Sequence, residues 1–600
     1  MTINTFSGRA GQPAIVAVSI LTLVALVYWP VIHAGFVWDD IIVFQQMSWL
    51  TEGNEWRHYI FRGFNYWTYY FRPLVVALFT AEVRLFDDQP AAMHAVSLCM
   101  HLVNTLLIGL IAWISAAATS RSHHQKIIFL ACSMLLYGLH PVLIEAVTWI
   151  GCQFDLMATM FMLLGIMANT LIRPRMARAI SVGTSFFLSA CCKESAVAFP
   201  AILAIHSWIT LPDAGKQDLW ANLRSFLHRH WKTFAALLVA GLAYLAFRRW
   251  ALGQLVPSIS NDAPSAFGRY QEVCFLYLHY WRTLFIPMPG MNPIHFVDTS
   301  LFGSATPKSV LTDILATTIV LSSLYLGIAR RSALACIVLA VTAAMLPVLH
   351  VVPTAFDASL YHERYVLTGL AIGCAMLPLV RVRLTADQRT WHFASRAAAF
   401  LGVIWLAAST LSIRTTVPLW SSNIGLWEWA LTLNPKSLDT MNNLLSAYIS
   451  KKDYGSADAL LEKIKASGVP CTICALNAAN MALERGKPSV ASGYLEEAKK
   501  SEEVANDRVL YGWYMLATGK MLLQQDNVPD AVDVLRASIE ATPSDPQPRL
   551  FLARALAAQG RLREARSVSE VGIAMLPANR RPAMQRVMDA LLQQSAEQAR

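Results

Sequence analysis

Long apolar segments recur through the first 420 residues of the chain. A helix that spans a membrane needs about 20 mostly apolar residues. Pro13–Ile32 is such a segment, and Ala91–Ser120 contains no charged side chain. With the remaining apolar segments, the pattern predicts about eleven spanning helices. The others are residues 127–144, 154–172, 176–192, 195–212, 233–250, 309–329, 332–350, 363–380 and 397–415.

The orientation of these helices follows from Lys and Arg, which are enriched in cytoplasmic loops. Tyr270–Pro287 is apolar enough to span, but its Glu272 and Arg282 suit a re-entrant or interfacial helix better. With that segment not spanning, the N-terminus is predicted inside and the C-terminal part outside. The clusters expected inside are Arg121 and Lys126; Arg173, Arg175 and Arg178; Lys216, Arg224, Arg229 and Lys232; Arg330 and Arg331; and Arg381, Arg383, Arg389 and Arg396.

From about residue 421 the apolar positions follow the spacing of amphipathic helix pairs. Small residues recur there at intervals of 34, 40 and 34 residues; they are Ala457, Ala491, Ala531 and Ala565. Turn-compatible residues precede the last three alanines by five positions; they are Gly486, Asp526 and Gly560. Pro543 and Pro577 are also 34 residues apart. This joint periodicity resembles the tetratricopeptide pattern, whose repeats stack into a concave protein-binding surface; a plain helical bundle is the alternative.

Composition separates the same two parts. Of the whole chain 55% is hydrophobic and only 15% charged, with a net charge of +10. Residues 421–600 contain 21 Lys and Arg against 20 Asp and Glu, so nearly all of the excess positive charge belongs to the apolar part. Cytoplasmic loops explain that excess better than nucleic-acid binding does. We therefore expect a membrane domain over residues 1–417 and a soluble all-α domain over residues 418–600.

The ten cysteines are too few for a disulfide scaffold in 600 residues. Only Cys471 and Cys474 form a short-spaced pair outside the apolar segments. In an outer compartment such a pair is compatible with a local disulfide, and helix packing is the plainer interpretation. One pair gives no support for a four-ligand zinc site.

Polar side chains gather at the ends of the apolar segments that are expected outside. Asp39 and Asp40 follow the first segment directly, which is costly at a membrane exit unless the carboxylates have a function. The others are Arg72 in Tyr70–Leu74, Glu145 and Asp155 after His140, the pair Lys193-Glu194, and the run His362, Glu363, Arg364 and Tyr365. Charges at one face of a bundle suggest a shared polar cavity. Boundary residues, structural ion pairs and a snorkelling Arg364 are the plainer interpretations.

Taken together, these stretches resemble the GT-C superfamily of polyprenyl-phosphate-sugar-dependent glycosyltransferases. Within it they are most similar to the tetratricopeptide-containing branch of transmembrane O-mannosyltransferases and bacterial relatives, some of which modify type IV pilins. The matching stretches are Phe36–Asp40, Tyr70–Leu74, His140–Asp155, Lys193-Glu194, Glu363–Tyr365 and Trp420–Pro435. The resemblance implies an inverting enzyme of the bacterial inner membrane that glycosylates Ser or Thr of an exported protein, with its repeat domain in the periplasm.

Sugar transfer to a hydroxyl needs a base for the acceptor and a site for the phosphate leaving group. Either Asp39 or Asp40 can serve as the base, and the resemblance favours Asp39. Arginine suits phosphate because its planar fork donates two hydrogen bonds, so Arg364 is the first candidate and Arg72 the second. The remaining outer residues are expected to bind substrate: Glu145, Asp155, Lys193, Glu194, His362, Glu363 and Tyr365.

Two carboxylates without a third fixed ligand give thin support for a divalent cation, so no obligatory metal or other cofactor is expected. Two other classes of function remain open on the sequence. A membrane-anchored scaffold would depend on its repeats alone. A transporter or flippase would distribute its charges along the membrane path rather than at one face.

Overall fold

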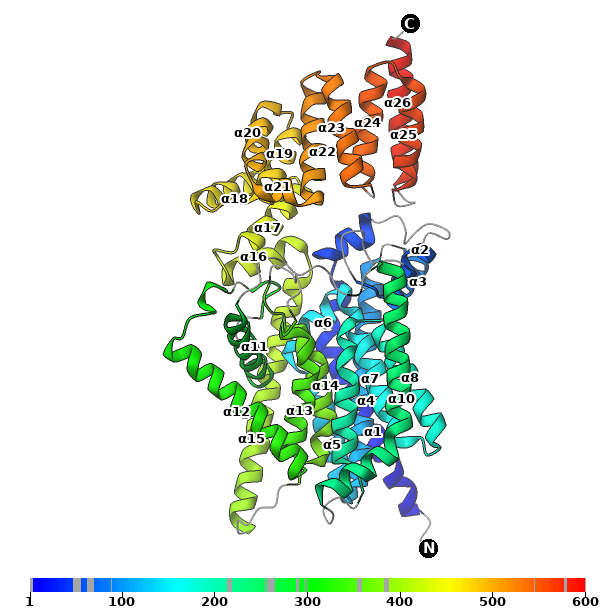
Figure 1. Ribbon diagram of the computed structural model, residues 1–600, viewed down its shortest axis with the longest axis vertical. Coiled ribbons are helices and arrows are strands. Elements are labelled where there is room, and N and C mark those ends of the chain that lie inside the picture. The colour runs from blue at the N-terminus through cyan, green and yellow to red at the C-terminus, as the bar shows by residue number, and fades with distance from the viewer. Residues whose placement is uncertain are drawn as a thin grey trace.

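Helices make up the ordered elements of the computed structural model, and the residues that it describes include no strand. Figure 1 shows a helical bundle that contains the N-terminus and a helical stack that ends at the C-terminus. The structure describes residues 4–46, 56–61, 70–87, 89–212, 218–253, 255, 265–287, 291–295, 297, 299–352, 359–381, 388–543, 545–576 and 580–598. Lys216, Arg383 and Pro577, and parts of the outer loops between residues 34–90, 251–308 and 351–364, lie outside these ranges.

The bundle is built from helices α1 to α15, and most of its long helices lie roughly along the long axis of the molecule (Figure 1). Their bounds are α1 Asn4–Tyr28, α2 Trp56–Ile60, α3 Pro73–Phe86, α4 Pro90–Ala118, α5 His123–Gly138, α6 Ile144–Thr148, α7 Gln153–Leu171, α8 Arg175–Ala190, α9 Phe199–Ile209, α10 Leu219–Leu252, α11 Ala266–Phe285, α12 Pro307–Ala329, α13 Ala333–Met345, α14 Leu367–Met376 and α15 Gln388–Thr416.

Within the described ranges, six segments are long and apolar enough to cross a membrane, against the eleven or so expected. They are Gly11–His33, Pro90–Ala118, Ile150–Leu171, Leu219–Leu252, Pro307–Ala329 and Phe393–Trp420. A seventh is added if the pair His123–Gly138 and Pro141–Thr148, bent by 50°, counts as one span. The other four expected segments form only the short helices α8, α9, α13 and α14. Helix α11, in the segment expected to be re-entrant or interfacial, is not among the six.

Proline explains most of the shortened helices, because it removes a backbone donor and disfavours helical geometry in the residue before it. Pro174 is the residue before α8, and Pro200 stands in the first turn of α9. The apolar segments containing α13 and α14 end in separate 3-10 turns, Leu346–Val348 and Leu377–Leu379, each with proline at its start. A count of apolar residues does not register these interruptions.

Helices α10 and α15, which begin with two of the basic clusters expected inside, start at the end of the bundle opposite the stack (Figure 1). Arg121 donates to the carbonyl of Val380 at 2.6 Å, and Arg381 donates to the carbonyl of Thr119 at 3.4 Å. Arg331 donates to the carbonyl of Trp208. Arg178 of α8 donates to the backbone carbonyl of Arg229 in α10 at 2.9 Å. The clusters described here therefore share one end of the molecule.

The stack has the predicted paired helices. Its bounds are α16 Asn423–Leu433, α17 Leu438–Ser450, α18 Tyr454–Ala466, α19 Thr472–Glu484, α20 Pro488–Lys499, α21 Glu502–Asn506, α22 Arg508–Gln524, α23 Val528–Ala541, α24 Pro546–Ala558, α25 Leu562–Ala574 and α26 Arg581–Gln598. The four periodic alanines, Ala457, Ala491, Ala531 and Ala565, are all fully buried. The short extra helix α21 accounts for the interval of 40 residues in place of 34.

The turn between the two helices of each repeat contains a left-handed residue. Gly486, Asp526 and Gly560 have φ of 65°, 60° and 74°, and Lys452 takes the equivalent position of the first repeat with φ of 59°. This conformation lets the second helix fold back on the first, and glycine adopts it at the lowest cost.

Cys471 and Cys474 form a disulfide at the start of α19, so helix packing alone does not describe the pair. The sulfur of Cys471 also accepts a hydrogen bond from the backbone N–H of Cys474 at 3.3 Å, which caps the helix.

One hydrophobic core passes from the bundle into the first repeats. It includes Val37 of the first outer loop, Trp420 and Trp427 at the junction, and Leu445 of α17, each 2% exposed or less. The junction is the 3-10 turn Val417–Trp420, of which Val417 and Trp420 are buried. The first repeats are therefore held against the bundle by apolar packing.

Gly486→Ala tests the left-handed turn against a matched change in the same repeat. It is expected to destabilise the protein by about 1 kcal/mol, because alanine resists positive φ. Gly493→Ala, inside α20 with equally open space around the added methyl group, is expected to stabilise it by about 0.5–1 kcal/mol. Thermal unfolding of the purified full-length protein measures both, and effects of the same sign would contradict the turn assignment.

Candidate functional site

The loop that follows α1 is fastened to the start of the stack. Gly35 N–H donates to the carbonyl of Ser421 at 2.9 Å, and Trp38 N–H donates to Asn423 Oδ1 at 3.1 Å. Asn423 Oδ1 also accepts from the indole N–H of Trp427 at 3.0 Å. Trp38 has φ of 54°, a strained value for a bulky side chain. The chain thus turns sharply at Trp38, immediately before the two aspartates.

Aromatic rings fix Trp38 on three sides. Its ring stacks on Trp149 with centroids 4.8 Å apart, meets Trp427 edge-on at 5.6 Å, and lies 6.0 Å from His362. Aromatic pairs at such separations add about 0.5–1.5 kcal/mol beyond their buried area, which helps to offset the strained backbone. The turn is held by packing from three separate parts of the sequence.

Asp39 lines a cavity of about 220 Å³ at the junction of the bundle and the stack. The other lining residues come from the same loop, from the bundle and from α17; they are Trp38, Trp149, Ile294, Ser359, His362, Asp439, Asn442 and Asn443. The Asp39 side chain is exposed. A carboxylate in that position can accept a proton from a molecule bound in the cavity.

Asp40 points away from this cavity and is only 1% exposed. Its Oδ1 accepts a hydrogen bond from the backbone N–H of Gly151 at 2.9 Å. Burial raises the pKa of Asp40 well above its usual range; the hydrogen bond from Gly151 lowers it, and the negative charge of Asp39 raises it further. The two adjacent carboxyls therefore differ in surroundings: Asp39 lines the cavity, whereas Asp40 is buried and binds the backbone of Gly151.

Arg364 and Glu145 form a buried ion pair beside the tryptophans. Arg364 Nη1 binds Glu145 Oε1, and the backbone N–H of Arg364 donates to Glu145 Oε2 at 3.2 Å. His362 Nδ1 lies 3.5 Å from the same carboxylate. The guanidinium lies 4.9 Å from the ring centre of Trp149 and 5.9 Å from that of Trp38. The snorkelling position that the sequence also allowed for Arg364 is therefore wrong.

Two more ion pairs adjoin this one. Lys193 Nζ lies 2.5 Å from Asp155 Oδ1. Glu194 accepts from Arg72 Nε at 3.0 Å and from Arg248 Nη1 at 3.2 Å. Each expected cation thus has a protein carboxylate as a partner.

Aromatic rings connect the three pairs. Tyr365 lies 5.0 Å from the Arg364 guanidinium and 5.1 Å from Lys193 Nζ, and Phe154 lies 5.0 Å from Lys193 and 4.4 Å from Arg72. The residues predicted from separate loops therefore form one continuous polar network. Asp39 alone among the predicted charged groups lines the cavity.

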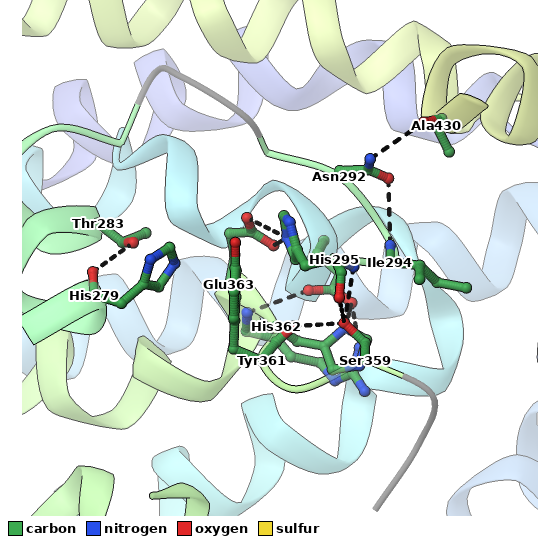
Figure 2. A network of polar contacts seen from close by, with 12 residues as sticks. His279, Thr283, Asn292, Ile294, His295, Ser359, Tyr361, His362, Glu363 and Ala430 are labelled. Atoms are coloured by element: carbon green, nitrogen blue, oxygen red, sulfur yellow. Dashed lines mark hydrogen bonds and ion pairs between the residues drawn. The ribbon is translucent and has the colours of Figure 1, made fainter. Parts of the chain in front are cut away.

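Glu363 belongs to a second network, which Figure 2 shows. His295 Nε2 lies 2.8 Å from Glu363 Oε1, and the His295 ring stacks on Tyr361 with centroids 4.2 Å apart. Burial lowers the pKa of His295, but the adjacent Glu363 carboxylate outweighs burial and the pKa is raised. This pair fixes the loop from which Ser359 and His362 reach the cavity.

Two asparagines tie the same side to the stack. Asn292 Nδ2 donates to the carbonyl of Ala430 in α16 at 3.4 Å, and Asn434 Nδ2 donates to the carbonyl of Ile294 at 3.0 Å. The backbone N–H of His295 donates to Ser359 Oγ at 2.9 Å (Figure 2). Because Ile294 and Ser359 line the cavity, these hydrogen bonds fix the position of that part of its wall.

The sequence did not indicate the cavity residues outside the motifs. These are Ile294, Ser359, Asp439, Asn442 and Asn443. Trp149 lies within the matching stretch His140–Asp155 but was not singled out. The adjacent amides of α17 were a readable signal, since asparagine is a poor helix former outside the caps. Nothing in the sequence paired His295 with Glu363. In the described ranges no group of three or more His, Cys, Asp or Glu side chains is arranged to hold a metal ion.

Comparison with known proteins identifies one part of the chain. Residues 522–590 match the model of a tetratricopeptide repeat family. A search of curated proteins finds no match for the chain. The family match covers the last repeats, and helix pairs of the same design continue back to α17. The C-terminal domain is thus of a type that binds other proteins.

Substituting Asp40 tests its protonation. Asp40→Asn keeps an acceptor for Gly151 and is expected to leave stability unchanged or higher, whereas Asp40→Ala is expected to lose about 1–3 kcal/mol. A raised pKa in the folded state means that the wild type loses stability as the pH rises through that pKa, while Asp40→Asn does not. Unfolding temperatures from about pH 5 to pH 9 measure this difference. If the unfolding temperature of the wild type rises relative to that of Asp40→Asn as the pH increases, Asp40 is not protonated in the folded protein.

Breaking the Glu145–Arg364 pair tests its burial. Glu145→Ala is expected to cost about 3–5 kcal/mol, since it leaves an uncompensated buried charge. Glu145→Ala with Arg364→Met should recover part of that loss. The exposed pair Arg485–Asp458, 2.8 Å apart, is the control, and Asp458→Ala is expected to cost about 0–1 kcal/mol. Equal losses at both pairs in thermal unfolding would refute a buried pair.

Proposed function

We propose that this protein is a membrane glycosyltransferase of the GT-C type. It moves a sugar from a polyprenyl-phosphate donor to a Ser or Thr hydroxyl of an exported protein, with inversion at the anomeric carbon. The observation that carries the proposal is the exposed carboxylate of Asp39 in a cavity at the end of an apolar bundle, beside a network of buried cations.

Asp39 acts as the general base in this proposal. It takes the proton of the acceptor hydroxyl while the hydroxyl oxygen attacks the anomeric carbon. The bond from that carbon to the phosphate oxygen breaks, and the polyprenyl phosphate leaves with the electron pair. Attack and departure occur on opposite faces of the sugar, which inverts the centre. Trp38 and Trp149 offer apolar ring surface in the cavity for the sugar.

Arg364 remains the residue proposed for the leaving phosphate, and Glu145 becomes its positioning partner. A buried guanidinium held by a carboxylate stays in one orientation, which suits phosphate recognition. Lys193 and Arg72 belong to the same network, which they reach through the rings of Tyr365 and Phe154, and they add positive charge.

Asp155 and Glu194 hold Lys193 and Arg72 in place, and Tyr365 lies between Arg364 and Lys193. Glu363 fixes His295. His362 lines the cavity and stays proposed as a substrate-binding residue.

The proposed location is a bacterial inner membrane, with the N-terminus in the cytoplasm and the repeats in the periplasm. Loops rich in Lys and Arg stay on the cytoplasmic side, and the described basic clusters lie opposite the stack. The disulfide Cys471–Cys474 suits an oxidising compartment. The bent pair brings the candidate spans to seven in the described ranges, and we propose that the four short apolar helices lie in the membrane beside them without crossing it fully.

The acceptor is proposed to be an exported protein that docks on the repeats, and a type IV pilin is one protein of this kind. The donor is a substrate, and no obligatory cofactor is proposed. A scaffold function draws support from the tetratricopeptide match alone, but it gives the cavity residues no part to play.

Asp39→Asn tests the base directly. It is expected to lower sugar transfer by about 10²- to 10⁴-fold, as loss of a general base does, whereas Asp40→Asn should retain most activity. The assay supplies membranes with labelled polyprenyl-phosphate monosaccharides and with exported proteins from cells that lack the gene.

If Asp39→Asn transferred sugar at the wild-type rate, Asp39 would not be the general base. A scaffold predicts instead that the cavity variants remain functional and that changes on the surface of the repeats abolish function. A transporter predicts movement of the lipid-linked sugar across the membrane without any transfer to protein.

A further inference from the structure

The disulfide between Cys471 and Cys474 has one end open to the surroundings and one end closed. Cys471 is the N-cap residue of α19 and is partly exposed. Cys474 lies in the first turn of the same helix and is only 2% exposed. A molecule from outside can therefore reach Cys471 but not Cys474. The proposed sugar transfer gives this pair no part to play.

The short spacing of the pair argues against a purely structural disulfide. A disulfide stabilises a fold chiefly by closing a loop of the unfolded chain, and its effect grows with the length of that loop. Cys471 and Cys474 are only three positions apart. The start of α19 is also held by a side-chain contact, because Thr472 Oγ1 donates to Ser501 Oγ at 2.8 Å. The disulfide thus contributes little to stability that its surroundings do not already supply.

The start of α19 stabilises a negative charge on the Cys471 sulfur. The first N–H groups of a helix have no partner within it and carry partial positive charge. The N–H of Cys474 donates to this sulfur at 3.3 Å, and the first turn contains no acidic side chain. A thiolate that is stabilised in this way leaves readily in disulfide exchange, and a stabilised reduced form makes the disulfide a stronger oxidant.

Apolar side chains surround Cys471 in the sequence and are exposed. Val469 is 55% exposed and Ile473 is 37% exposed, and Pro470 between Val469 and Cys471 is exposed as well. Contact with such side chains favours a partner that has apolar groups of its own beside the reacting sulfur. A polypeptide offers apolar groups next to a cysteine, whereas a small polar thiol such as glutathione does not.

The pair also lies near the candidate active site. Cys474 and Asn477 are at positions i and i+3 of α19, so they are neighbours on the helix. Asn477 Nδ2 donates to Asn442 Oδ1 at 2.8 Å, and Asn442 lines the cavity. A polypeptide joined to Cys471 is therefore held close to the cavity wall.

We propose that Cys471 and Cys474 are a redox-active pair that passes its disulfide to two cysteines of an exported polypeptide. This activity is separate from sugar transfer and does not depend on it. The two proposals share only the outer location of the repeats.

The exchange proceeds through a mixed disulfide. A thiolate of the polypeptide attacks the Cys471 sulfur, the bond between the two protein sulfurs breaks, and the Cys474 sulfur leaves with the electron pair and takes up a proton. The second thiolate of the polypeptide then attacks the polypeptide sulfur of the mixed disulfide, and Cys471 leaves as the stabilised thiolate. Two electrons pass from the polypeptide to the pair. Of the two protons that the polypeptide loses, one is bound by Cys474 and the other goes to the solvent.

A single-turnover reaction tests the exchange itself. The oxidised full-length protein in lipid nanodiscs is mixed, without oxygen, with a reduced synthetic peptide that has two cysteines flanked by leucines. Acid stops the reaction, free thiols are alkylated, and mass spectrometry reads both partners. We expect one oxidised peptide for each protein, with Cys471 and Cys474 both alkylated. A pair that keeps its disulfide while the peptide stays reduced would overturn the inference.

Two matched variants test the difference in exposure. Cys474→Ser leaves the partly exposed cysteine, and Cys471→Ser leaves the buried one. Each reduced variant reacts with a peptide whose single cysteine is activated by a coloured aromatic thiol, and absorbance follows the release of that thiol. Cys474→Ser is expected to react at least about tenfold faster, because reactivity follows exposure and thiolate character. Equal rates, or a faster reaction of Cys471→Ser, would contradict the assignment.

The double variant Cys471→Ser with Cys474→Ser measures the background from the eight other cysteines, which is subtracted. Unfolding temperatures show that each variant is folded. A double variant that does not fold would indicate a structural disulfide and count against the inference.

A third comparison tests the class of partner. Val469→Ser with Ile473→Ser is expected to slow the reaction with the leucine-flanked peptide about tenfold and to leave the reaction with glutathione unchanged, because only the peptide loses apolar contact. The control is Val490→Ser at the start of α20, an exposed valine at the opposite end of the same repeat. If the double variant slows both thiols equally, or neither, the partner is not an apolar polypeptide and the inference is wrong.

Discussion

The sharp turn at Trp38 is the constraint on which the rest of the site depends. A bulky residue at φ of 54° is held there because its N–H is bonded to Asn423 and its ring is packed between Trp149 and Trp427. These partners come from the bundle and from the start of the stack, so the turn exists only when both are in place. Strain that the surroundings hold in this way is common at functional sites.

Several features of the site follow from that turn. It sends two adjacent carboxyls in different directions, Asp39 to the cavity and Asp40 to Gly151. It also places the cavity at the seam of the two domains, where α17 supplies the opposite wall. One continuous hydrophobic core joins the bundle to the first repeats and so holds the two sides of the cavity together. In the proposed enzyme, acceptor recognition and catalysis are consequently parts of one structure.

Periodic features of the sequence predicted the fold well where one residue decides the local geometry. The buried alanines at Ala457, Ala491, Ala531 and Ala565 and the left-handed turns before them follow from spacing alone. The span count was too high, because apolar length does not register the proline breaks around α9, α13 and α14. The motif residues Arg364, Glu145, Lys193 and Asp155 lie in one network of buried ion pairs but do not line the cavity, and their pairing was not readable from the sequence. Asp39 and Asp40 lie in different surroundings, and α17 forms part of the cavity wall. Both features depend on contacts between residues that are far apart in the sequence, so local patterns do not predict them.

A structure of the full-length protein with a non-transferable analogue of a polyprenyl-phosphate sugar would test the central claim most directly. The proposed mechanism predicts the sugar in the cavity beside Trp38 and Trp149, the phosphate towards Arg364, and Asp39 facing the anomeric carbon from the side opposite the phosphate. A sugar bound outside this cavity, or an Asp39 on the same side as the phosphate, would contradict it.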